Sequence, residues 1–435
     1  MTGDIDLHVN MCNITFRNPV LSAASEIAYD VRSVKKCVQH GCGGVVLKST
    51  MHPNVPVAGR RPIPNMASLR PLGADFKSSF LADPIFSHIK PDEFINKELP
   101  EIVKLCRDSE VPVIGSISAS DQVDEWIELA EKFADKGIDM LEINLSCPHT
   151  ILFDGKGLKV GATIAEDIGL AGSIIRAVKK AVDIPVSVKM SPRLEPSGYF
   201  ARAYADAGID ALSAHNSPVG MVIDVDREEE FGTYSGGYLA GRTFLPISLA
   251  KINEIMKIVK VPISGMGGII NAIDALQYIL LGCPTVQVCT AIMVYGYGQF
   301  GKIIKGITDW MESKGYTSIE EFRGKVKPKD PKELPLCEPF EYKSPELALG
   351  PATIKIDTDK CNLCGNCVEI CLYDAFEIRR NNKVINFHDE KCYNCGMCVG
   401  LCPKGALKLV DRKNGETLWD GRGLQKKVLP SKQPL

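Results

Sequence analysis

The sequence predicts an α/β protein in which a (β/α)8 barrel of the TIM type is followed by a small, cysteine-rich C-terminal domain. Three observations support this fold class. Between residues 20 and 300, short apolar runs alternate with longer segments of helical period, which is typical of repeated βα units. Eight such runs are enough to close a barrel. After Gly315 the alternation stops, and half of the sixteen cysteines follow between Cys361 and Cys402.

The eight predicted strands are short apolar runs spaced along the first 300 residues. At the start of three of them, the chain carries Val-Pro-Val, Ile-Pro-Val or Val-Pro-Ile, and the proline separates the preceding helix from the strand. The predicted strands are Val20–Ala24, Gly44–Lys48, Val111–Ser116, Met140–Leu145, Pro185–Lys189, Ala211–His215, Pro262–Gly265 and Thr285–Cys289.

Helical period is clearest in two segments between these strands. In Asp124–Lys136, apolar residues recur at i, i+3, i+4, i+7 and i+8, and Gly137 follows where a C-terminal cap is favoured. Pro246 opens a second amphipathic run, Ile247–Val259, because proline suits the first turn of a helix.

Length and composition restrict the functional class. The chain has 435 residues, which suffices for a barrel of ordinary size and a small extra domain. Its net charge of -2 provides no basic field for nucleic acid or a membrane surface. The most apolar stretch, Ala275–Tyr297, contains Gly282 and Pro284 and is predicted as a buried helix followed by a buried strand. We expect a cytoplasmic protein, because the N-terminus lacks an export pattern and sixteen cysteines suit a reducing compartment.

Two cysteine motifs characterise the C-terminal domain. Each reads Cys-x2-Cys-x2-Cys with a fourth cysteine after three residues, a spacing that holds [4Fe-4S] clusters and in which the fourth cysteine ligates the other cluster. Zinc sites and disulfides are the alternatives, but they need fewer cysteines or another spacing. Pro403 follows the last cysteine as usual, whereas Leu372 replaces the proline after the first motif. We assign Cys361, Cys364, Cys367 and Cys402 to one cluster and Cys392, Cys395, Cys398 and Cys371 to the second.

The domain boundaries follow from these patterns. Residues 1–324 are predicted to form the barrel and residues 351–410 the two-cluster ferredoxin-like domain. Between them, residues 325–350 contain Lys-Pro-Lys-Asp-Pro and three further prolines, which is typical of a stiff linker. Residues 411–435 are predicted as a polar tail. Since clusters carry single electrons, the barrel must provide a source or destination for them.

In a βα barrel, functional residues collect at the C-terminal ends of the strands. Lys48 and Lys189 end two predicted strands, where a buried ammonium group needs a partner or shifts its pKa. A cofactor with a phosphate or an electron-rich ring would provide that partner. A structural ion pair is the alternative for either lysine alone.

A glycine-rich segment follows the predicted strand Pro262–Gly265. Gly267 and Gly268 lead into the predicted helix Asn271–Leu281, so backbone N–H groups and the helix dipole favour an anion there. With Thr290 after the eighth strand, this is where barrels place a phosphate. An ordinary glycine-rich turn is the alternative.

The fourth predicted strand ends in Asn-Leu-Ser-Cys-Pro-His, which brings a thiol and an amide to the mouth of the barrel. Cys147 can exchange a proton with a substrate, and Asn144 can hydrogen-bond an amide or carbonyl. Asn216 and Ser217 follow the sixth strand at the same end. A buried spacer is the alternative for Cys147 and a turn former for Asn216, but together these groups favour a ligand site.

These motifs resemble those of the dihydroorotate dehydrogenase family of flavoproteins. The resemblance rests on the Asn-Leu-Ser-Cys-Pro-His run, the two lysines, the Asn216-Ser217 pair, Gly-Gly-Ile and Gln-Val-Cys-Thr-Ala, and it covers essentially all 435 residues. With the two-cluster domain, the chain is most similar to the dihydropyrimidine dehydrogenases within this family. The match is to the flavin-barrel and ferredoxin part of the long eukaryotic enzyme, or to the shorter bacterial catalytic subunit.

The resemblance implies that FMN binds in the barrel and that an activated C=C bond of a pyrimidine-like ring, such as uracil or thymine, is reduced or formed. Cys147 takes the position of the general acid/base. FMN exchanges both hydride and single electrons, which links such a substrate to the clusters. Substrate contacts are implied for Asn144, Asn216 and Ser217. FMN contacts are implied for Ala23, Lys48, Ser49, Lys189, Gly241, Gly267, Gly268, Cys289 and Thr290.

Three positions depart from the dihydropyrimidine pattern. Ala82 follows the Ser-Ser-Phe-Leu run where that group has an asparagine that contacts the ring, and Glu26 and His215 stand where uncharged residues are expected. Losing one polar contact to a ring amide costs on the order of a few kcal/mol of discrimination. Another conjugated cyclic or enoyl substrate is therefore an alternative. The segment 150–161 also differs, and we expect it to act as a lid over Cys147.

The electron donor is expected to be a second polypeptide. No predicted strand leads into a G-x-G-x-x-G helix start, the pattern of a dinucleotide site. An NAD(P)H-oxidising flavoprotein subunit or a ferredoxin would supply electrons, and we expect an oligomer with no membrane or nucleic-acid partner. An electron-transfer subunit without its own catalysis is a further alternative, which the retained Cys147 disfavours. A phosphosugar-type barrel without flavin would leave the clusters unexplained.

Overall fold

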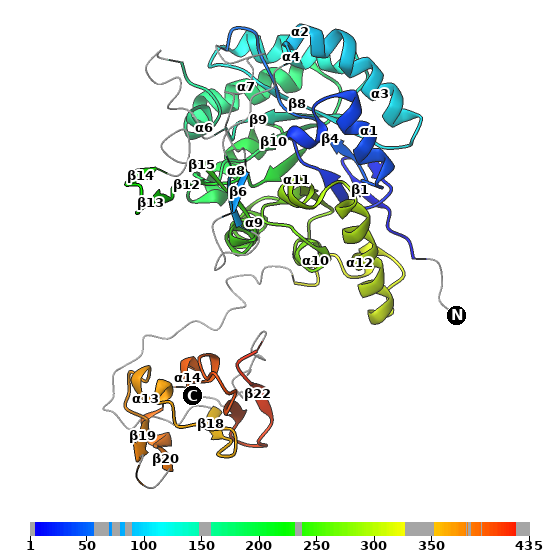
Figure 1. Ribbon diagram of the computed structural model, residues 1–435. Coiled ribbons are helices and arrows are strands. Elements are labelled where there is room, and N and C mark those ends of the chain that lie inside the picture. Colours follow the sequence, from blue (N-terminus) through cyan, green and yellow to red (C-terminus); the bar gives the residue numbers. More distant parts are fainter. Residues whose placement is uncertain are drawn as a thin grey trace. The chain divides into compact units, whose positions relative to one another are not determined.

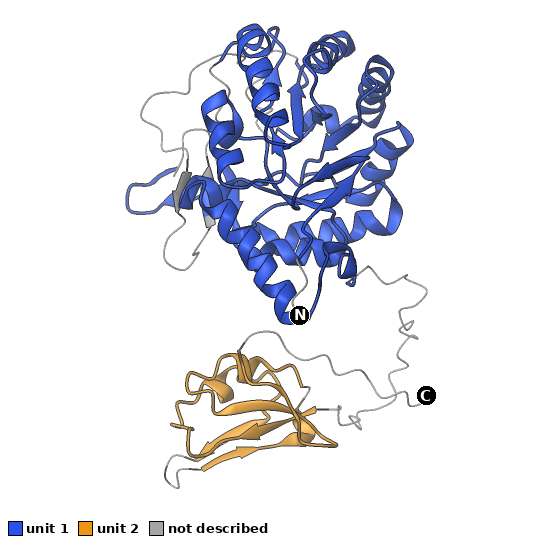
Figure 2. Cartoon of the chain, turned by 90° about the vertical axis from the view of Figure 1, so that its right-hand side faces the viewer, with its two compact units in different colours: residues 1–334 blue, residues 335–435 orange. Residues whose placement is uncertain are grey.

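The computed structural model describes residues 5–55, 69–71, 79–82, 89–147, 158–230, 237–326, 352–379, 381, 384–392 and 394–422, and for residues 69–71, 79 and 82 the backbone alone. The chain divides into two units, Met1–Leu334 and Pro335–Leu435 (Figure 2). The division falls within residues 325–350, the segment that the sequence predicts as a linker.

Unit 1 is built on eight parallel strands surrounded by helices (Figure 1). Neighbours in the order β3-β17-β16-β11-β10-β9-β8-β4 pair in parallel, and a parallel bridge between Leu21 and Gly44 joins the two ends. The sheet is thus a nearly closed barrel, and the predicted fold class is confirmed. All eight predicted strands are present, with ends that differ by a few residues. They are β3 Val20–Ser22, β4 Val45–Val46, β8 Val113–Ser118, β9 Met140–Asn144, β10 Val186–Lys189, β11 Ala211–Ala214, β16 Ile263–Met266 and β17 Thr285–Val288.

The helices cover the outside of the barrel and carry the predicted amphipathic stripes. In α4, Trp126, Leu129 and Phe133 are buried, and Gly137 follows with a φ of +82° that favours glycine. Pro246 lies in the first turn of α9, as its fixed φ favours. The helices of unit 1 are α1 Val31–Gln39, α2 Pro91–Glu93, α3 Leu99–Arg107, α4 Val123–Ala134, α6 Ala162–Glu166, α7 Ile168–Ala181, α8 Ser197–Asp206, α9 Leu245–Ile258, α10 Ala272–Leu281, α11 Thr290–Tyr295 and α12 Gln299–Lys314, with the 3-10 turns η1 Glu26–Ala28, η4 Arg242–Phe244 and η5 Ile319–Glu321 and the π-helix η3 Phe94–Glu98.

The most apolar stretch of the sequence forms α10 and β17, as predicted. Among the helices in the described stretches, none has the length and apolar character that crossing a membrane requires.

The core surrounds and fills the barrel. The barrel strands are buried on both faces because the helices cover one face and the barrel interior occupies the other. The interior is partly polar: Gln287 Nε2 donates hydrogen bonds to Ser213 Oγ at 3.0 Å and to Ser264 Oγ at 3.2 Å. These contacts satisfy side chains that burial would otherwise penalise.

Short antiparallel strands extend from the barrel between its βα units. They form a sheet in the order β12-β15-β7-β6, in which Tyr238 of β15 lies opposite Ala82 of β7 and Val219 of β12. This sheet positions Tyr238 and Gly241 for the site described below. The strands outside the barrel order are β1 Val9–Met11, β2 Ile14–Phe16, β5 Thr50–Met51, β6 Leu69–Pro71, β7 Ser79–Ala82, β12 Val219–Gly220, β13 Ile223–Asp224, β14 Glu229–Glu230 and β15 Gly237–Gly241.

Unit 2 has its own small core between a three-stranded sheet, a hairpin and two one-turn helices. The strand Thr417–Trp419 pairs with β21, so the segment predicted as a tail from residue 411 begins with residues that belong to this sheet. Apolar packing explains this pairing, because Leu418 is buried and the Trp419 ring lies against Gly396 and Gly400. The elements are β18 Ala352–Ile356, α13 Asn366–Glu369, β19 Phe376–Arg379, β20 Val384–Phe387, η8 Asp389–Lys391, α14 Met397–Gly400, β21 Leu407–Asp411 and β22 Thr417–Trp419.

Candidate functional site

Both predicted lysines lie at the C-terminal end of the barrel strands. Lys48, two residues after β4, forms an ion pair with Glu26 of η1, with 2.5 Å between Nζ and Oε1. Lys189 ends β10, is only 5% exposed, and forms no hydrogen bond through Nζ with the described residues. Because a buried ammonium without a partner is costly, this position fits a ligand with a phosphate or an electron-rich ring, as in a flavin.

The three predicted glycines come together from two elements. Gly241 ends β15, and Gly267 and Gly268 follow β16. A Cβ on Gly268 would lie 2.7 Å from the Leu245 nitrogen and 2.9 Å from the Gly241 carbonyl oxygen, and φ at Gly268 is +75°. Only glycine therefore fits here, and the backbone is left accessible to a ligand phosphate.

Arg242 is a cation at this cradle that the sequence analysis missed. Its Nη2 lies 3.1 Å from Oδ1 of Asp274, a fully buried carboxylate in the first turn of α10. Asp274 also forms a capping box with Asn271, so the predicted start of this helix is fixed by side chains. The sequence does indicate this residue, because Arg242 directly follows Gly241, a predicted flavin contact.

Ala23, Cys289 and Thr290 lie at the adjoining ends of β3 and β17. The Ala23 N–H donates to the carbonyl of the last residue of β17 at 3.0 Å, and Cys289 is the residue before α11, which begins at Thr290. These predicted residues therefore share one sector of the barrel mouth.

The pKa of the Cys289 thiol depends on the charged groups at this mouth of the barrel. Burial first, and then the carboxylate of Glu26, raise the pKa of this thiol to about 11, although the charges of Lys189 and Lys48 act in the opposite direction. Glu26 and the two lysines thus lie within electrostatic range of one thiol.

Asn144 and Asn216 are joined through Ser146. Asn144 Oδ1 accepts a hydrogen bond from Ser146 Oγ at 2.7 Å. Asn216 Nδ2 donates to the backbone carbonyl oxygen of Ser146 and to Ser146 Oγ, each at 3.1 Å. Asn144 Nδ2 also donates to Ser49 Oγ at 2.8 Å, and the Ser217 N–H donates to Asn216 Oδ1 at 2.9 Å. The structure therefore brings four of the predicted residues into one network, and both amide groups are held in fixed orientations.

This network continues into the barrel. Ser49 Oγ lies 2.8 Å from Ser116 Oγ, which donates to Glu142 Oε1 at 3.2 Å. Glu142 is fully buried, and its Oε2 has no hydrogen-bond partner in the described part of the chain. Neither Ser116 nor Glu142 was identified from the sequence, because each lies inside a mostly apolar strand and not at its C-terminal end.

Cys147 lies three residues after β9, beside Tyr238 of β15. The distance from Cys147 Sγ to Tyr238 Oη is 3.7 Å, within reach of an O–H···S or S–H···O hydrogen bond. On its other side, a Cβ on Gly161 would lie 2.7 Å from the Cys147 Cβ, and the Ala162 N–H donates to the Cys147 carbonyl at 3.0 Å. The thiol therefore stands between β15 and the described end of the segment predicted as a lid.

The predicted lid lies largely outside the described residues. Its last residues, Leu158 and Val160, pack against Met51 and Val55. The lid role of residues 150–161 remains a prediction.

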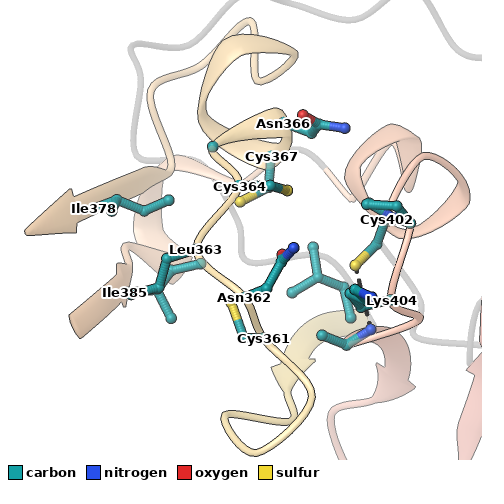
Figure 3. Close-up of a pocket in the computed structure, with 14 residues that line it drawn as sticks. Cys361, Asn362, Leu363, Cys364, Asn366, Cys367, Ile378, Ile385, Cys402 and Lys404 are labelled. Atoms are coloured by element: carbon teal, nitrogen blue, oxygen red, sulfur yellow. Dashed lines mark hydrogen bonds between the residues drawn. The ribbon is translucent and has the colours of Figure 1, made fainter. Parts of the chain in front are cut away.

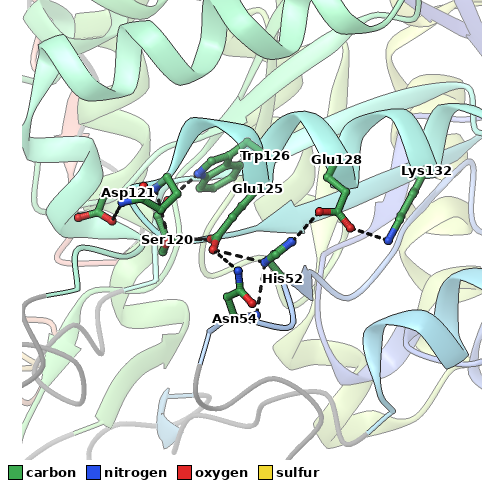
Figure 4. Close-up of polar contacts among 9 residues, drawn as sticks. His52, Asn54, Ser120, Asp121, Glu125, Trp126, Glu128 and Lys132 are labelled. Carbon is green, nitrogen blue, oxygen red and sulfur yellow. Dashed lines mark hydrogen bonds and ion pairs between the residues drawn. The ribbon is translucent and has the colours of Figure 1, made fainter.

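A buried histidine fixes the segment after β5. His52 Nε2 lies 3.2 Å from Glu128 Oε2, and Nδ1 lies 3.5 Å from Glu125 Oε1, which also accepts a hydrogen bond from Asn54 Nδ2 at 2.8 Å (Figure 4). Lys132 first, and then His52, hold the pKa of Glu128 below its usual range. These contacts secure the segment that carries Val55 to the packing beside Cys147, and the sequence analysis did not identify them.

Two of the three departures from the dihydropyrimidine pattern can be described in full. Glu26 is the partner of Lys48. His215 follows β11 and is 1% exposed; burial lowers its pKa to about 3, so the imidazole is neutral, and neither ring nitrogen has a hydrogen-bond partner among the described residues. The side chain of Ala82 lies outside the described residues, but its backbone pairs with Tyr238.

In unit 2, the first predicted cluster set lines a single pocket. Cys361, Cys364, Cys367 and Cys402 surround one hollow (Figure 3). The Ala406 N–H donates to Cys402 Sγ at 3.2 Å, a contact of the kind that tunes a bound cluster.

The second predicted set also converges. Burial first, and then the nearby Cys392, Cys395, Cys367 and Cys371, raise the pKa of the Cys398 thiol to about 12, so Cys398 lies near the thiols of its own set and near Cys367 of the first. The Ala375 N–H donates to Cys371 Sγ at 3.3 Å, which matches the contact at Cys402.

Both sets have the Cys-x2-Cys-x2-Cys spacing that is typical of [4Fe-4S] ligands. In the residues that the structure describes, no three His, Cys, Asp or Glu side chains lie close enough together to hold one metal ion. Zinc needs four ligands at about 2.0–2.3 Å, whereas a four-iron cluster separates its thiolates.

The barrel mouth and the cysteine pocket together define an oxidoreductase that combines a flavin barrel with an iron–sulfur domain. Comparison with known proteins agrees: the family model described as "Dihydroorotate dehydrogenase" matches residues 6–311, and the model described as "4Fe-4S dicluster domain" matches residues 341–406. The chain belongs to the dihydroorotate dehydrogenase family.

Three relatives illustrate the similarity. The chain is 31% identical over 324 residues to "Dihydroorotate dehydrogenase B (NAD(+)), catalytic subunit" of Methanocaldococcus jannaschii, which covers 74% of this chain and 98% of the relative. It is 30% identical over 320 residues to the protein of the same name from Geobacter sulfurreducens, covering 73% and 97%. It is 28% identical over 342 residues to "Dihydropyrimidine dehydrogenase (NADP(+)), chloroplastic" of Arabidopsis thaliana, covering 73% and 76%.

Proposed function

We propose that the protein is an FMN- and iron–sulfur-dependent oxidoreductase that reduces, or forms, an activated C=C bond of a pyrimidine-like ring. Cys147 acts as the general acid/base, and Asn144, Asn216 and Ser217 contact the ring. The observation that carries the proposal is the convergence of the Cys147 thiol with the Asn144–Ser146–Asn216 network at one barrel mouth. Two fixed amides suit the amide edges of a pyrimidine, and the thiol provides the proton.

FMN is proposed as the hydride carrier because the residues at the mouth fit it. Lys189 is a buried ammonium group suited to the flavin ring, and Gly241, Gly267 and Gly268 form a cradle suited to the phosphate. Lys48, Ser49, Ala23, Cys289 and Thr290 complete the proposed contacts. When bound, FMN supplies or accepts the hydride and exchanges single electrons with clusters.

A neutral ring is favoured over a carboxylated one. The Lys48 charge is compensated by Glu26, His215 is neutral, and Lys189 is proposed to contact the flavin and not the substrate. Uracil and thymine are neutral, whereas orotate carries a carboxylate that gains from an uncompensated cation. We therefore propose uracil or thymine, with the dihydro form as product or substrate, although several relatives are named for dihydroorotate.

A second substrate class has one specific observation in its favour. Ala82 lacks the amide of the asparagine that contacts the ring in the dihydropyrimidine group, and Tyr238 lies opposite it in the sheet. Another conjugated cyclic or enoyl compound is the alternative substrate. An electron-transfer subunit without catalysis is disfavoured because Cys147 and both amides are retained together.

Electrons are proposed to reach the chain from another polypeptide. We propose two [4Fe-4S] clusters, one held by Cys361, Cys364, Cys367 and Cys402 and the other by Cys392, Cys395, Cys398 and Cys371. Relatives at about 30% identity are named catalytic subunits of an NAD(+) enzyme, which supports a separate subunit that handles the nucleotide. A flavoprotein subunit or a ferredoxin would fill this role.

Two measurements test the proposal. Acid extraction of the holoprotein is expected to release FMN with about eight irons per chain, as two four-iron clusters require. A screen with reduced methyl viologen as donor is expected to reduce uracil or thymine faster than orotate or unrelated enoyl compounds. Absence of FMN would overturn the flavin assignment, and a preference for orotate would overturn the pyrimidine assignment.

A further inference from the structure

We propose that Tyr238 is a positioning residue for Cys147, and that its phenol hydroxyl donates a hydrogen bond to the Cys147 sulfur after the thiol has given up its proton. This inference rests on the proposed role of Cys147 as general acid/base. It assigns a function to a residue that the motifs of the sequence did not single out.

The contact joins two parts of the chain that are distant in sequence. Cys147 follows a barrel strand, whereas Tyr238 lies in β15 of the antiparallel sheet, and the Sγ–Oη distance is 3.7 Å. Since sulfur is larger than oxygen, this separation is within hydrogen-bond range for an O–H···S contact, and a thiolate would draw the hydroxyl closer.

Both partners are held by their backbones. Tyr238 is paired on one side with Ala82 of β7 and on the other with Val219 of β12. Cys147 is fixed through its carbonyl by the Ala162 N–H, and Gly161 leaves no room for a side chain beside it. The fold therefore places the two backbones so that the phenol can reach the thiol.

The electrostatic surroundings keep the phenol protonated. Burial raises the pKa of Tyr238 well above its ordinary value, and the neighbouring Cys147 and Glu26 raise it further, because a phenolate would face a thiolate and a carboxylate. A neutral phenol beside a thiolate can only donate its hydrogen. This is the arrangement that favours the deprotonated form of the thiol.

The proton balance of the reaction explains the need for such a donor. In the reducing direction, Cys147 Sγ would give its proton to one carbon of the double bond, and FMN, when bound, would supply the hydride to the other, so that C=C becomes CH–CH. A thiolate remains and takes a proton from solvent before the next turnover. In the oxidising direction the thiolate is the base, and the Tyr238 hydroxyl stabilises it before the reaction.

The test measures the thiol itself, without substrate. The holoprotein is treated with iodoacetamide at a series of pH values, and the alkylation rate of Cys147 is followed in its own peptide by mass spectrometry, since only the thiolate reacts. In Tyr238→Phe, the midpoint of the rate profile is expected to rise by about one pH unit, the size of one hydrogen bond to a charged group. Tyr204→Phe is the matched control, because Tyr204 is also buried but donates to the Ala165 carbonyl.

The outcomes are distinct. An unchanged midpoint in Tyr238→Phe, or an equal rise in Tyr204→Phe, would overturn the proposal. If the Phe variant does not fold, Tyr238→Gln and Tyr238→Leu replace it. Gln keeps a hydrogen-bond donor, so its alkylation profile should have the lower midpoint pH. Equal midpoints in the two variants would contradict the proposed hydrogen bond. Because alkylation needs no substrate, a negative substrate screen leaves this measurement interpretable, and a negative alkylation result leaves the substrate assignment standing.

Discussion

At the scale of single residues, the proposed chemistry depends first on Cys147, the proposed general acid/base. Cys147→Ser and Cys147→Ala are expected to lower kcat by roughly 10²- to 10⁴-fold, the usual contribution of a general acid. Flavin content should be unchanged, because the proposed flavin contacts come from other residues. Turnover with reduced viologen and the flavin absorbance of the purified variants check this. Equal rates for variant and parent would contradict the assigned role.

The Glu26–Lys48 pair is expected to determine whether the site prefers a neutral or a negatively charged substrate. Replacing Glu26 by Gln leaves the Lys48 ammonium without its carboxylate partner. The ratio of kcat/KM for orotate to that for uracil should then rise about tenfold, because a hydrogen bond to a charged group contributes about 1.5–3 kcal/mol. Exposed Glu320 of η5, which pairs with Arg323, provides a control as Glu320→Gln. A ratio that stays constant in Glu26→Gln would show that the pair does not discriminate.

His215 is expected to make the barrel sensitive to acid. Burial lowers its pKa from 6.5 to about 3. Below pH 6.5, the imidazole is therefore protonated in the unfolded chain but stays neutral in the folded chain until the pH approaches 3. Its contribution to stability is therefore fully present above pH 6.5 and is lost as the pH falls towards 3, by about 1.4 kcal/mol per pH unit. Between pH 7 and pH 5, Tm should fall about 3 °C further in the parent than in His215→Gln. Parallel Tm profiles would exclude His215 as the source.

At the scale of elements, the glycine cradle after β16 depends on one backbone conformation. Gly268→Ala is expected to lose most of the bound flavin, because its Cβ would meet the Leu245 nitrogen at 2.7 Å and φ is +75°. Gly208→Ala is the matched control: φ is +100° there, but nothing lies within 4 Å of a Cβ. It should carry the conformational cost alone, with normal flavin content. Iron content should be normal in both, and equal flavin content in both would refute the cradle.

A comparison of the elements shows which strands and helices could be predicted from the sequence. The eight barrel strands are predictable because each is a short, mostly apolar run that is buried on both faces, and α4 because its apolar stripe has one clear period. The sheet β12-β15-β7-β6 is not, because its short strands pair across long sequence separations. Tyr238 was missed for the same reason: nothing near it in the sequence marks the approach to Cys147.

In unit 2, local spacing carried more of the information. The cysteine motifs predict two ligand sets, because each motif places three thiols on one loop and one-turn helix, and both sets stay a prediction. The end of the domain was harder to place from composition, since β22 is short and flanked by polar residues, and only its pairing with β21 and the burial of Leu418 reveal it.

For the whole molecule, the decisive question is whether electrons pass through two separate clusters with crossed ligation. Cys402 belongs to the second motif in sequence but lines the pocket of the first, with Cys361. Cys402→Ser and Cys361→Ser should each lower iron from about eight to about four per chain, and the double variant should lose no more, because both remove the same cluster. Combining Cys402→Ser with Cys392→Ser should remove both. Flavin should remain in all four, since its proposed contacts lie in the barrel. Ligation within each motif would reverse the two double variants, which iron analysis of the full-length protein distinguishes directly.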